Sequence, residues 1–243
     1  LLMVTKSLTK EKAKILQAEL LKELWEFQRQ EKLIAPIRKY CPQEPNLKQR
    51  LFLSLQPDKD QSILECLFGG AAGGSKSSAL LMAALQYVHV PGYSCLILRR
   101  DFARLNLAGG LIPRSKSWLH DKAKWRDKEK IWEFDTGPGN RIATIQFGYL
   151  ENQNDKYRYG SSEYTTIEWD ELTEFPEEDY LFMFSRLRMT EDIRKQANIC
   201  YRMLSASNPG GRYHDWVKNR FISEEAEEDR KQGILKEVYY KAA

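Results

Sequence analysis

The chain carries the stretch Gly70-Ala71-Ala72-Gly73-Gly74-Ser75-Lys76-Ser77, and this stretch decides the fold. It lies between an apolar segment, Ile63–Phe68, that suits a β-strand and an apolar segment that suits a helix beginning near Ser77. Small residues let backbone N–H groups close around phosphate oxygens, a lysine reaches the terminal phosphates, and a hydroxyl binds Mg²⁺. A glycine-rich run can also be a flexible turn, but Lys76 and Ser77 at its end favour a phosphate-binding loop.

One position departs from the usual pattern, which has glycine immediately before the lysine. Ser75 stands there, so the position must either accept a side chain or strain the loop slightly. We interpret the serine as a tolerated variant. The predicted ATP contacts run through the loop into the helix, at Gly70, Ala71, Ala72, Gly73, Gly74, Ser75, Lys76, Ser77 and Ser78.

A bound triphosphate also needs an acidic metal ligand and a group that orients the attacking water. The segment Thr165-Thr166-Ile167-Glu168-Trp169-Asp170-Glu171 supplies both, because its β-branched and aromatic residues suit a strand that ends in two carboxylates. Asp170 is the expected Mg²⁺ ligand, directly or through water, and Glu171 the expected general base. Such a pair is otherwise often solvated surface charge, and Glu168 makes this strand less apolar than a fully buried one usually is.

Composition restricts the class of protein. A length of 243 residues suits one large α/β core, and a net charge of +4 permits a polyanionic partner without requiring one. No apolar run approaches the ~20 residues that span a bilayer, so we expect a soluble protein. The cysteines are far apart in sequence and are expected to be reduced core residues rather than zinc ligands or disulfides: Cys41, Cys66, Cys95 and Cys200.

The N-terminal segment predicts an amphipathic helix over residues 9–30 that packs against the body or a neighbouring subunit. Its apolar residues recur at helical spacing: Ala13, Leu16, Leu20, Leu24 and Phe27. A proline-containing connector, from Ala35-Pro36 to Pro45, is expected to follow and to lead to Gln49. The Gln49 amide offers a donor and an acceptor to an adenine edge, although an exposed glutamine often has no role.

Further strands and helices are expected after the loop. A helix is expected over Ser77–Val88 and a strand over Tyr93–Leu98, whose end at Arg99-Arg100-Asp101 would lie on the ligand side of an open sheet. Alternating segments on either side of residues 135–140, at Lys130–Phe134 and Arg141–Tyr149, predict an added β-hairpin.

Two segments each admit two interpretations. The basic and aromatic stretch over residues 116–130, with Trp118 and Trp125, suits nucleic acid, but a solvated amphipathic surface is favoured. The last expected strand, Asn198–Ala206, continues into Ser207-Asn208-Pro209-Gly210-Gly211. There the Asn208 amide suits a sensor of the γ-phosphate, and the alternative is a simple Asn-Pro-Gly turn.

In this order the motifs resemble the large terminase subunits of tailed bacteriophages and prophages, specifically their N-terminal packaging ATPase. The resemblance covers roughly residues 46–222. It rests on the series Phe68 to Ser77, Leu98-Arg99-Arg100, Phe147-Gly148-Tyr149-Leu150, Trp169-Asp170-Glu171-Leu172, Ser185-Arg186-Leu187-Arg188, Ser207 to Gly211 and His214-Asp215-Trp216-Val217.

The resemblance implies an α/β P-loop NTPase fold of the ASCE/RecA-like kind, with a mainly parallel central sheet flanked by helices, an added β-hairpin and an N-terminal helix. The expected organisation is an N-terminal helical segment and connector (1–45), an ATPase core (46–222) and a C-terminal linker (223–243). It implies a motor that hydrolyses ATP with Mg²⁺ and translocates double-stranded DNA into a procapsid. Implied partners are the portal protein and the small terminase subunit, with a homo-oligomeric ring in the host cytoplasm and no membrane.

The family's roles transfer to residues of this chain by motif. The phosphate-loop lysine falls on Lys76, the metal-binding hydroxyl on Ser77, and the acidic pair on Asp170 and Glu171. The adenine-side glutamine falls on Gln49, and the coupling motif on Ser205, Ser207 and Asn208. Some terminases complete the ATP site with an arginine from a neighbouring subunit. Arg158 matches that placement, and the rival candidates are Arg186 and Arg188; all three are alternatively surface or DNA-contacting residues.

Two departures from the family bear on activity. Certain terminases carry an arginine inside the phosphate loop, and this loop has none, which favours a finger from elsewhere. Members also usually continue into a nuclease domain, whereas this sequence ends at Ala243, so we expect no DNA cleavage by this chain.

Three alternatives to a packaging motor remain at this stage. A helicase-like translocase shares the ATP chemistry but normally pairs two such cores, and only one phosphate loop is present. A nucleotide-gated assembly protein would bind ATP without useful turnover. A small-molecule kinase is disfavoured, since no second substrate site or lid motif is evident.

Overall fold

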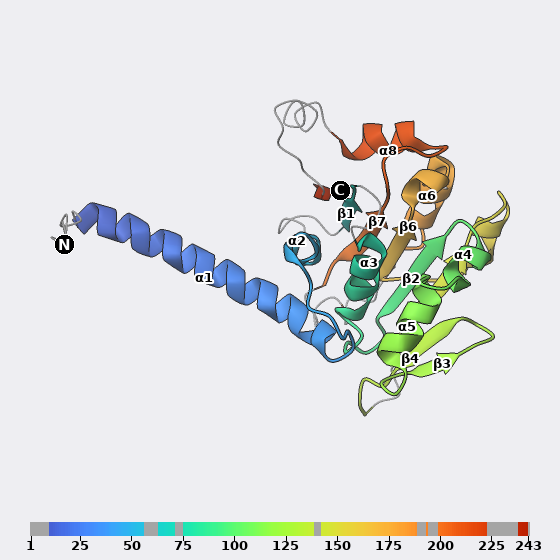
Figure 1. Ribbon diagram of the computed structural model, residues 1–243, viewed down its shortest axis with the longest axis horizontal. Coiled ribbons are helices and arrows are strands. Elements are labelled where there is room, and N and C mark those ends of the chain that lie inside the picture. Colours follow the sequence, from blue (N-terminus) through green and yellow to red (C-terminus); the bar gives the residue numbers. More distant parts are fainter. Residues whose placement is uncertain are drawn as a thin grey trace.

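The computed structural model describes residues 10–55, 63–70, 75–138, 142–188, 193, 199–222 and 238–242. At its centre is an eight-stranded sheet with helices on both faces (Figure 1). The strands lie in the order β3 (Lys124–Arg126), β4 (Ile131–Phe134), β5 (Ala143–Tyr149), β2 (Ser94–Arg99), β6 (Thr166–Asp170), β7 (Tyr201–Ala206), β1 (Ile63–Phe68) and β8 (Val238–Ala242). The helices are α1 (Lys10–Arg38), α2 (Leu47–Ser54), α3 (Lys76–Leu85), α4 (Phe102–Asn106), α5 (Leu111–Leu119), α6 (Glu177–Phe184) and α8 (His214–Phe221), with 3₁₀ turns η1 (Asp155–Tyr159) and η2 (Leu172–Glu174).

The five central strands, from β5 to β1, are parallel. Their side chains are buried on both faces, as parallel strands covered by helices require. Strand β7 lies between β1, which leads into the glycine-rich loop, and β6, which carries the acidic pair. The prediction of a mainly parallel sheet flanked by helices in a P-loop NTPase fold is confirmed.

The predicted β-hairpin is present, because β4 and β5 pair antiparallel with Phe134 opposite Ala143. It is not an addition beside the core, however. Strand β5 also pairs parallel with β2 along six residues, from Ser94 opposite Thr144 to Arg99 opposite Tyr149. One arm of the hairpin is therefore a strand of the central sheet.

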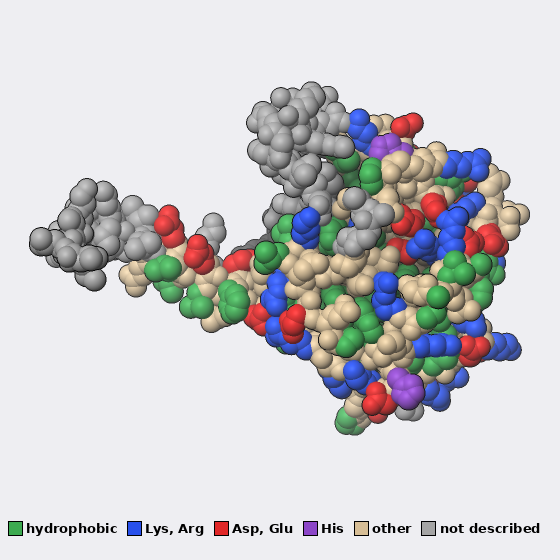
Figure 2. Space-filling view, viewed as in Figure 1, with side chains coloured by type: hydrophobic (Ala, Val, Ile, Leu, Met, Phe, Trp, Pro, Cys, Tyr) green, Lys and Arg blue, Asp and Glu red, His purple; other side chains and the backbone are tan. Residues whose placement is uncertain are grey.

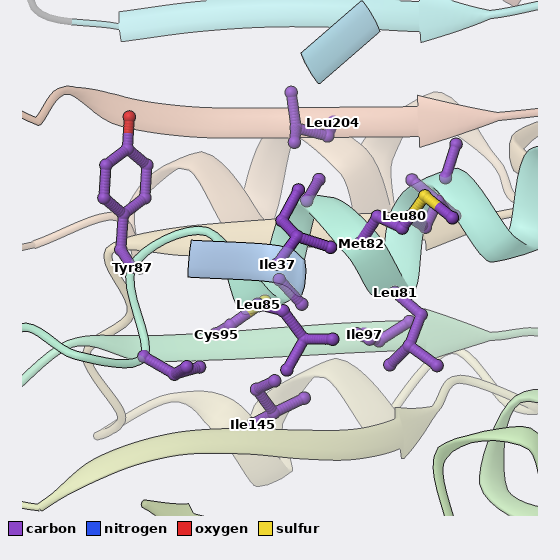
Figure 3. Packing of buried hydrophobic residues seen from close by; sticks show 14 of the residues in the cluster. Ile37, Leu80, Leu81, Met82, Leu85, Tyr87, Cys95, Ile97, Ile145 and Leu204 are labelled. Atoms are coloured by element: carbon purple, nitrogen blue, oxygen red, sulfur yellow. The ribbon is translucent and has the colours of Figure 1, made fainter. Parts of the chain in front are cut away.

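Two hydrophobic clusters cover the two faces of the sheet. On one face, α3 packs over the strands, and Leu81, Leu85, Cys95, Ile97 and Ile145 lie close together (Figure 3). On the other face, Leu96 and Leu98 join α6 and α8 around Trp169 and Tyr180. Each buried leucine in such a core contributes roughly 1.5–3 kcal/mol of burial free energy. Because strand side chains alternate, β2 contributes to both clusters.

The same alternation positions the acidic strand. Ile167 and Trp169 enter the cluster beside α6, so Thr166, Glu168 and Asp170 face α3. Asp170 thus ends β6 on the side where α3 begins. Burial raises the pKa of Glu168 well above its ordinary value, with the nearby Arg202 guanidinium opposing the shift.

Helix α1 differs from the sequence prediction in two ways. It continues through Pro36 to Arg38 instead of ending near Gln30, so the first part of the expected connector is helical. Only its last turns pack on the body, through Ile34 and Ile37. The rest projects away (Figure 1), and the face expected to be covered is exposed along the arm (Figure 2). Among its described residues, the exposed large hydrophobic ones are Leu20, Leu21, Leu24, Trp25 and Phe27, each between 51% and 62% exposed.

The tryptophans of the basic and aromatic stretch before β4 pack against the protein itself. Trp118 is buried in the core, and Trp125 packs against Trp132 and Phe147 with ring centroids 5.0 and 6.2 Å away. The four cysteines are buried and free, as expected. Among the described residues, no helix combines the length and apolar character needed to cross a bilayer.

Candidate functional site

The candidate site lies where β1, β2, β6 and β7 end beside the start of α3. The Lys76 ammonium donates to the carbonyl oxygen of Gly70 at 3.1 Å, so the lysine folds back across the mouth of the loop. Gly70 has φ +125°, a conformation that favours glycine. Ala71, Ala72, Gly73 and Gly74 lie outside the described residues, and their ATP contacts stay predictions.

Ser75 adopts the conformation that glycine ordinarily supplies. Its φ is +52° and ψ +28°, in the left-handed region, at the N-cap of α3. A side chain there costs about 1–2 kcal/mol relative to the right-handed region. The sequence left open whether the loop accepts the Ser75 side chain without strain. The left-handed conformation of Ser75 shows that the loop is strained at this residue.

Gln49 forms hydrogen bonds with the strained Ser75. It is the third residue of α2, where it closes a capping box with Asn46: the Asn46 side chain accepts from the Gln49 backbone N–H, and Asn46 N–H donates to Gln49 Oε1 at 2.9 Å. Its Nε2 donates to the Ser75 carbonyl oxygen at 3.1 Å and lies 3.2 Å from Ser75 Oγ. Gln49 thus lies against the loop and is buried in α2, not exposed in a connector. Its contact with adenine stays a prediction.

The hydroxyl and the carboxylate predicted to hold the metal are in contact. Ser77 Oγ donates to Asp170 Oδ1 at 2.8 Å, across 93 residues of sequence. The other oxygen, Asp170 Oδ2, forms an ion pair with Arg99 Nη1. The Asp170 side chain is only 2% exposed, so both contacts lie in a poorly hydrated place. Ser78 points elsewhere: its hydroxyl accepts from Arg114 of α5 at 3.0 Å, and its predicted ATP contact stays a prediction.

Glu171 leaves the line of β6 through a left-handed residue. With φ +60° and ψ +60°, it follows the last residue of the strand and is the N-cap of η2. Its carboxylate accepts two hydrogen bonds from Asn208, from the backbone N–H to Oε2 at 3.2 Å and from Nδ2 to Oε1 at 2.9 Å. Burial raises the pKa of Glu171, the hydrogen bond from the Asn208 backbone N–H lowers it, and the negative charge of Asp170 raises it.

The segment after β7 is fastened to the turn after β6. Thr173 Oγ1 and Ser207 Oγ lie 2.8 Å apart, and Tyr213 N–H donates to the Thr173 carbonyl oxygen at 2.9 Å. Gly211 has φ +105°, and a Cβ there would lie 2.7 Å from Thr173 Oγ1, so the close approach requires glycine. Asn208 is therefore presented to Glu171 by a packed turn. Ser205 is buried inside β7, between Leu67 of β1 and Trp169 of β6, and its coupling role stays a prediction.

The chemistry of the donor set fits Mg²⁺. The Ser77 hydroxyl and Asp170 carboxylate are oxygen ligands, which Mg²⁺ prefers. The described residues form no cluster of three or more metal-ligating side chains, and Mg²⁺ characteristically binds through one or two protein groups with phosphates and waters completing its shell. Buried Asn208 Oδ1 and Arg99 Nε have no hydrogen-bond partner among the described residues. The site thus retains unused polar atoms beside the two predicted ligands.

The three candidate finger arginines lie apart from these ligands. Arg158 is on η1, stacked over the Tyr149 ring at 4.6 Å and paired with Asp155 at 2.8 Å, with 47% of its side chain exposed. Arg186 lies over the Phe182 ring, and Arg188 pairs with Glu163 at 3.3 Å with 56% of its side chain exposed. Within the described part of the chain, none of the three makes a contact with Asp170 or Glu171.

Sequence reasoning missed the residue that does contact Asp170. It placed Arg99 and Arg100 on the ligand side of the sheet without dividing their roles. Arg99 binds Asp170, whereas Arg100 donates to the carbonyl oxygens of Leu150 and Glu151, the latter at 2.7 Å. The available signal was alternation along β2, which sends adjacent side chains to opposite faces.

Three solved phage proteins are similar to this chain in structure. The large terminase from a thermophilic bacteriophage is 14% identical over 80% of this chain and 51% of its own length, with a TM-score of 0.53. The Thermus phage P74-26 large terminase ATPase domain is 14% identical over 73% of this chain and 69% of its own, with a TM-score of 0.45. The N-terminal domain of the bacteriophage phi29 DNA packaging ATPase is 15% identical over 65% and 80%, with a TM-score of 0.43.

The likeness to the large terminase of the thermophilic bacteriophage shows a shared fold, and this chain spans about half of that protein's length. Comparison of the sequence with protein-family models and with curated proteins gives no match.

Proposed function

We propose that this chain is the ATP-hydrolysing motor domain of a viral terminase, which translocates double-stranded DNA into a procapsid. One observation carries the proposal: Ser77, Asp170 and Glu171, the residues expected for a metal-dependent ATPase, come together with Asn208 at the start of α3. The fold shared with the large terminase of the thermophilic bacteriophage supports the nature of the motor.

Each side chain has a chemical task in the proposed reaction. Lys76 neutralises the terminal phosphates, and Ser77 and Asp170 hold Mg²⁺. When bound, the metal ion supplies charge neutralisation at the phosphates. Glu171 takes a proton from the attacking water, and its raised pKa makes the carboxylate a stronger base than an exposed glutamate. Gln49 contributes on the adenine side.

Coupling to DNA follows from the contact between Glu171 and Asn208. Asn208 follows β7, and the turn after it leads into α8. A change in the hydrogen bonds between Glu171 and Asn208 would therefore reach another surface of the protein. Ser205 and Ser207 belong to the same segment. In the proposed motor this segment reports hydrolysis to the surfaces that grip DNA.

The proposed active form is a homo-oligomeric ring in which Arg158 completes the site of a neighbouring subunit. Its side chain is exposed, and its described contacts are with Asp155 and Tyr149 rather than with the chain's own Asp170 and Glu171. Both observations support a role between subunits. The portal protein and the small terminase subunit are the proposed partners, in the host cytoplasm. A finger arginine is worth about 10³–10⁵ in rate.

The test is Mg²⁺-dependent ATP hydrolysis measured against protein concentration for the wild type, Glu171→Ala and Arg158→Ala. Specific activity should rise steeply with concentration, vanish in each variant and return in part when the two variants are mixed, because a mixed interface combines one intact Glu171 with one intact Arg158. Arg126→Ala is the matched control, because the Arg126 side chain is also 47% exposed and forms an ion pair with a carboxylate, that of Glu133. Unchanged turnover in Arg158→Ala would discard that finger, and no nucleotide binding by the wild type would contradict the proposed function itself.

A further inference from the structure

Arg99 and Asp170 form a charge pair at the centre of the candidate site. Arg99 ends β2 and Asp170 ends β6, and these strands are paired, with Leu98 opposite Trp169 one residue earlier. The register therefore brings the two side chains together. The Arg99 side chain is 20% exposed and that of Asp170 2%, so water screens the pair weakly.

The pair leaves neither oxygen of Asp170 uncommitted. Oδ1 accepts from Ser77 at 2.8 Å, and Oδ2 is paired with Arg99. A metal ion that binds directly to Asp170 must therefore share this carboxylate with Ser77 and Arg99. A guanidinium and a divalent cation on the same buried carboxylate repel each other, so metal binding weakens the pair with Arg99.

Arg99 is also incompletely satisfied where it lies. Its Nε is buried without a hydrogen-bond partner among the described residues, which is uncommon for a buried donor of a charged group. The adjacent Arg100 is held by two backbone carbonyl oxygens, of Leu150 and Glu151. The two neighbouring arginines thus differ: Arg100 is anchored to a loop, and Arg99 is anchored through Asp170.

We infer that Arg99 is a competitor of the metal ion for Asp170 and so sets how readily Mg²⁺ and nucleotide leave the site. While Arg99 holds Asp170, the buried carboxylate is neutralised without metal. With Mg²⁺ and nucleotide bound, Asp170 would contribute to holding the metal ion and its pair with Arg99 would weaken; after product release, Arg99 would pair with the carboxylate again. Arg99 is a positioning residue in this scheme, which rests on the proposed function and adds to it a determinant of product release.

The test is the binding of ADP, by calorimetry, with Mg²⁺ and with EDTA. In Arg99→Met the affinity for ADP with Mg²⁺ should rise about tenfold, the order expected when one partner of a close charge pair is removed and the other becomes available to the metal. The affinity in EDTA should not change. Arg100→Met is the matched control and should leave both affinities as in the wild type, since Arg100 contacts backbone rather than Asp170.

A second measurement needs no turnover and covers the case in which Arg99→Met folds poorly. Arg99→Lys keeps the charge and should tighten Mg²⁺·ADP binding in the same direction but less. A double-mutant cycle of Arg99→Lys and Asp170→Asn on thermal unfolding should show coupling in EDTA that disappears with saturating Mg²⁺·ADP. Coupling that Mg²⁺·ADP leaves intact, or weaker Mg²⁺·ADP binding in the arginine variants, would overturn the inference while leaving the ATPase proposal standing. Wild-type protein that binds no ADP in either condition would overturn both.

Discussion

Asn208 holds both carboxylate oxygens of Glu171, with its backbone N–H 3.2 Å from Oε2 and its side-chain Nδ2 2.9 Å from Oε1. The two residues are 37 positions apart and follow neighbouring parallel strands. These two hydrogen bonds fix the orientation of the Glu171 carboxylate. Substitution of Glu171 tests its basicity, and substitution of Asn208 tests the hydrogen bonds that orient it.

Glu171→Gln should remove turnover while leaving nucleotide binding intact. The amide keeps the shape of the side chain and loses its basicity, so we expect kcat to fall by about 10²- to 10⁴-fold. Turnover and ADP affinity measured side by side check this. Glu174→Gln is the control, because Glu174 lies on the same turn but pairs with Arg104. A Glu171→Gln variant with substantial turnover would mean that another group activates the water.

Asn208→Ala should move the acidic limb of the pH–rate profile to higher pH. The Nδ2 bond stabilises ionised Glu171, so its loss raises a pKa that burial has already raised. The base then needs a higher pH to be deprotonated. The profile of kcat against pH tests this prediction. The control is Asn152→Ala, at an exposed asparagine distant in sequence from Asn208, which should leave the acidic limb unchanged. A limb that moves to lower pH would contradict the assigned effect of Asn208.

Ser75→Gly should be more stable than Ser75→Ala by about 1 kcal/mol, because only alanine keeps a Cβ in the left-handed conformation. Both variants lose the Ser75 hydroxyl and its contact with Gln49, so the difference isolates the backbone. Urea unfolding of the two variants measures it. Equal stabilities would show that the residue at 75 leaves the left-handed region when the hydroxyl is absent.

Glu168→Gln should be more stable than the wild type at pH 8 and similar to it near pH 4. The folded protein keeps Glu168 protonated above the ordinary value of 4.5, whereas the unfolded chain ionises there. The wild type therefore loses stability as pH rises from that value through the raised folded pKa. The gap at pH 8 should be roughly 1–3 kcal/mol. Glu151→Gln, at an exposed glutamate, should show no such gap, and a gap that closes at high pH would reverse our assignment.

Much of the fold could be predicted from the sequence, because apolar patterning and loop chemistry are local. The strand Ile63–Phe68 has the predicted bounds, and Ser77 and Asp170, from distant parts of the sequence, are in contact. Proline was a misleading signal at Pro36. It lies near the C-terminal end of a long helix, whose continuation depends on packing by Ile34 and Ile37 that no local pattern reveals.

The site was less predictable where it depends on register. Alternation along the strand separates Arg99 from Arg100, but only the pairing of β2 with β6 determines which of the two faces Asp170. The environment of Gln49 was likewise hidden, because its contact with the loop joins it to Ser75, 26 positions away in the sequence. The tryptophans before β4 suited a nucleic-acid surface by composition, but Trp118 is buried in the core and the partly buried Trp125 packs against Trp132 and Phe147.

The projecting helix α1 also changes how the protein moves through solution. At 1.5 Å per residue its 29 residues extend about 43 Å, much of that length clear of the body (Figure 1). A monomer with such an arm experiences more friction than a sphere of 28.4 kDa and elutes early from a sizing column. An elution volume would therefore overstate the number of subunits, and the assembly state during ATP hydrolysis has to be measured by light scattering or sedimentation equilibrium, which report mass independently of shape.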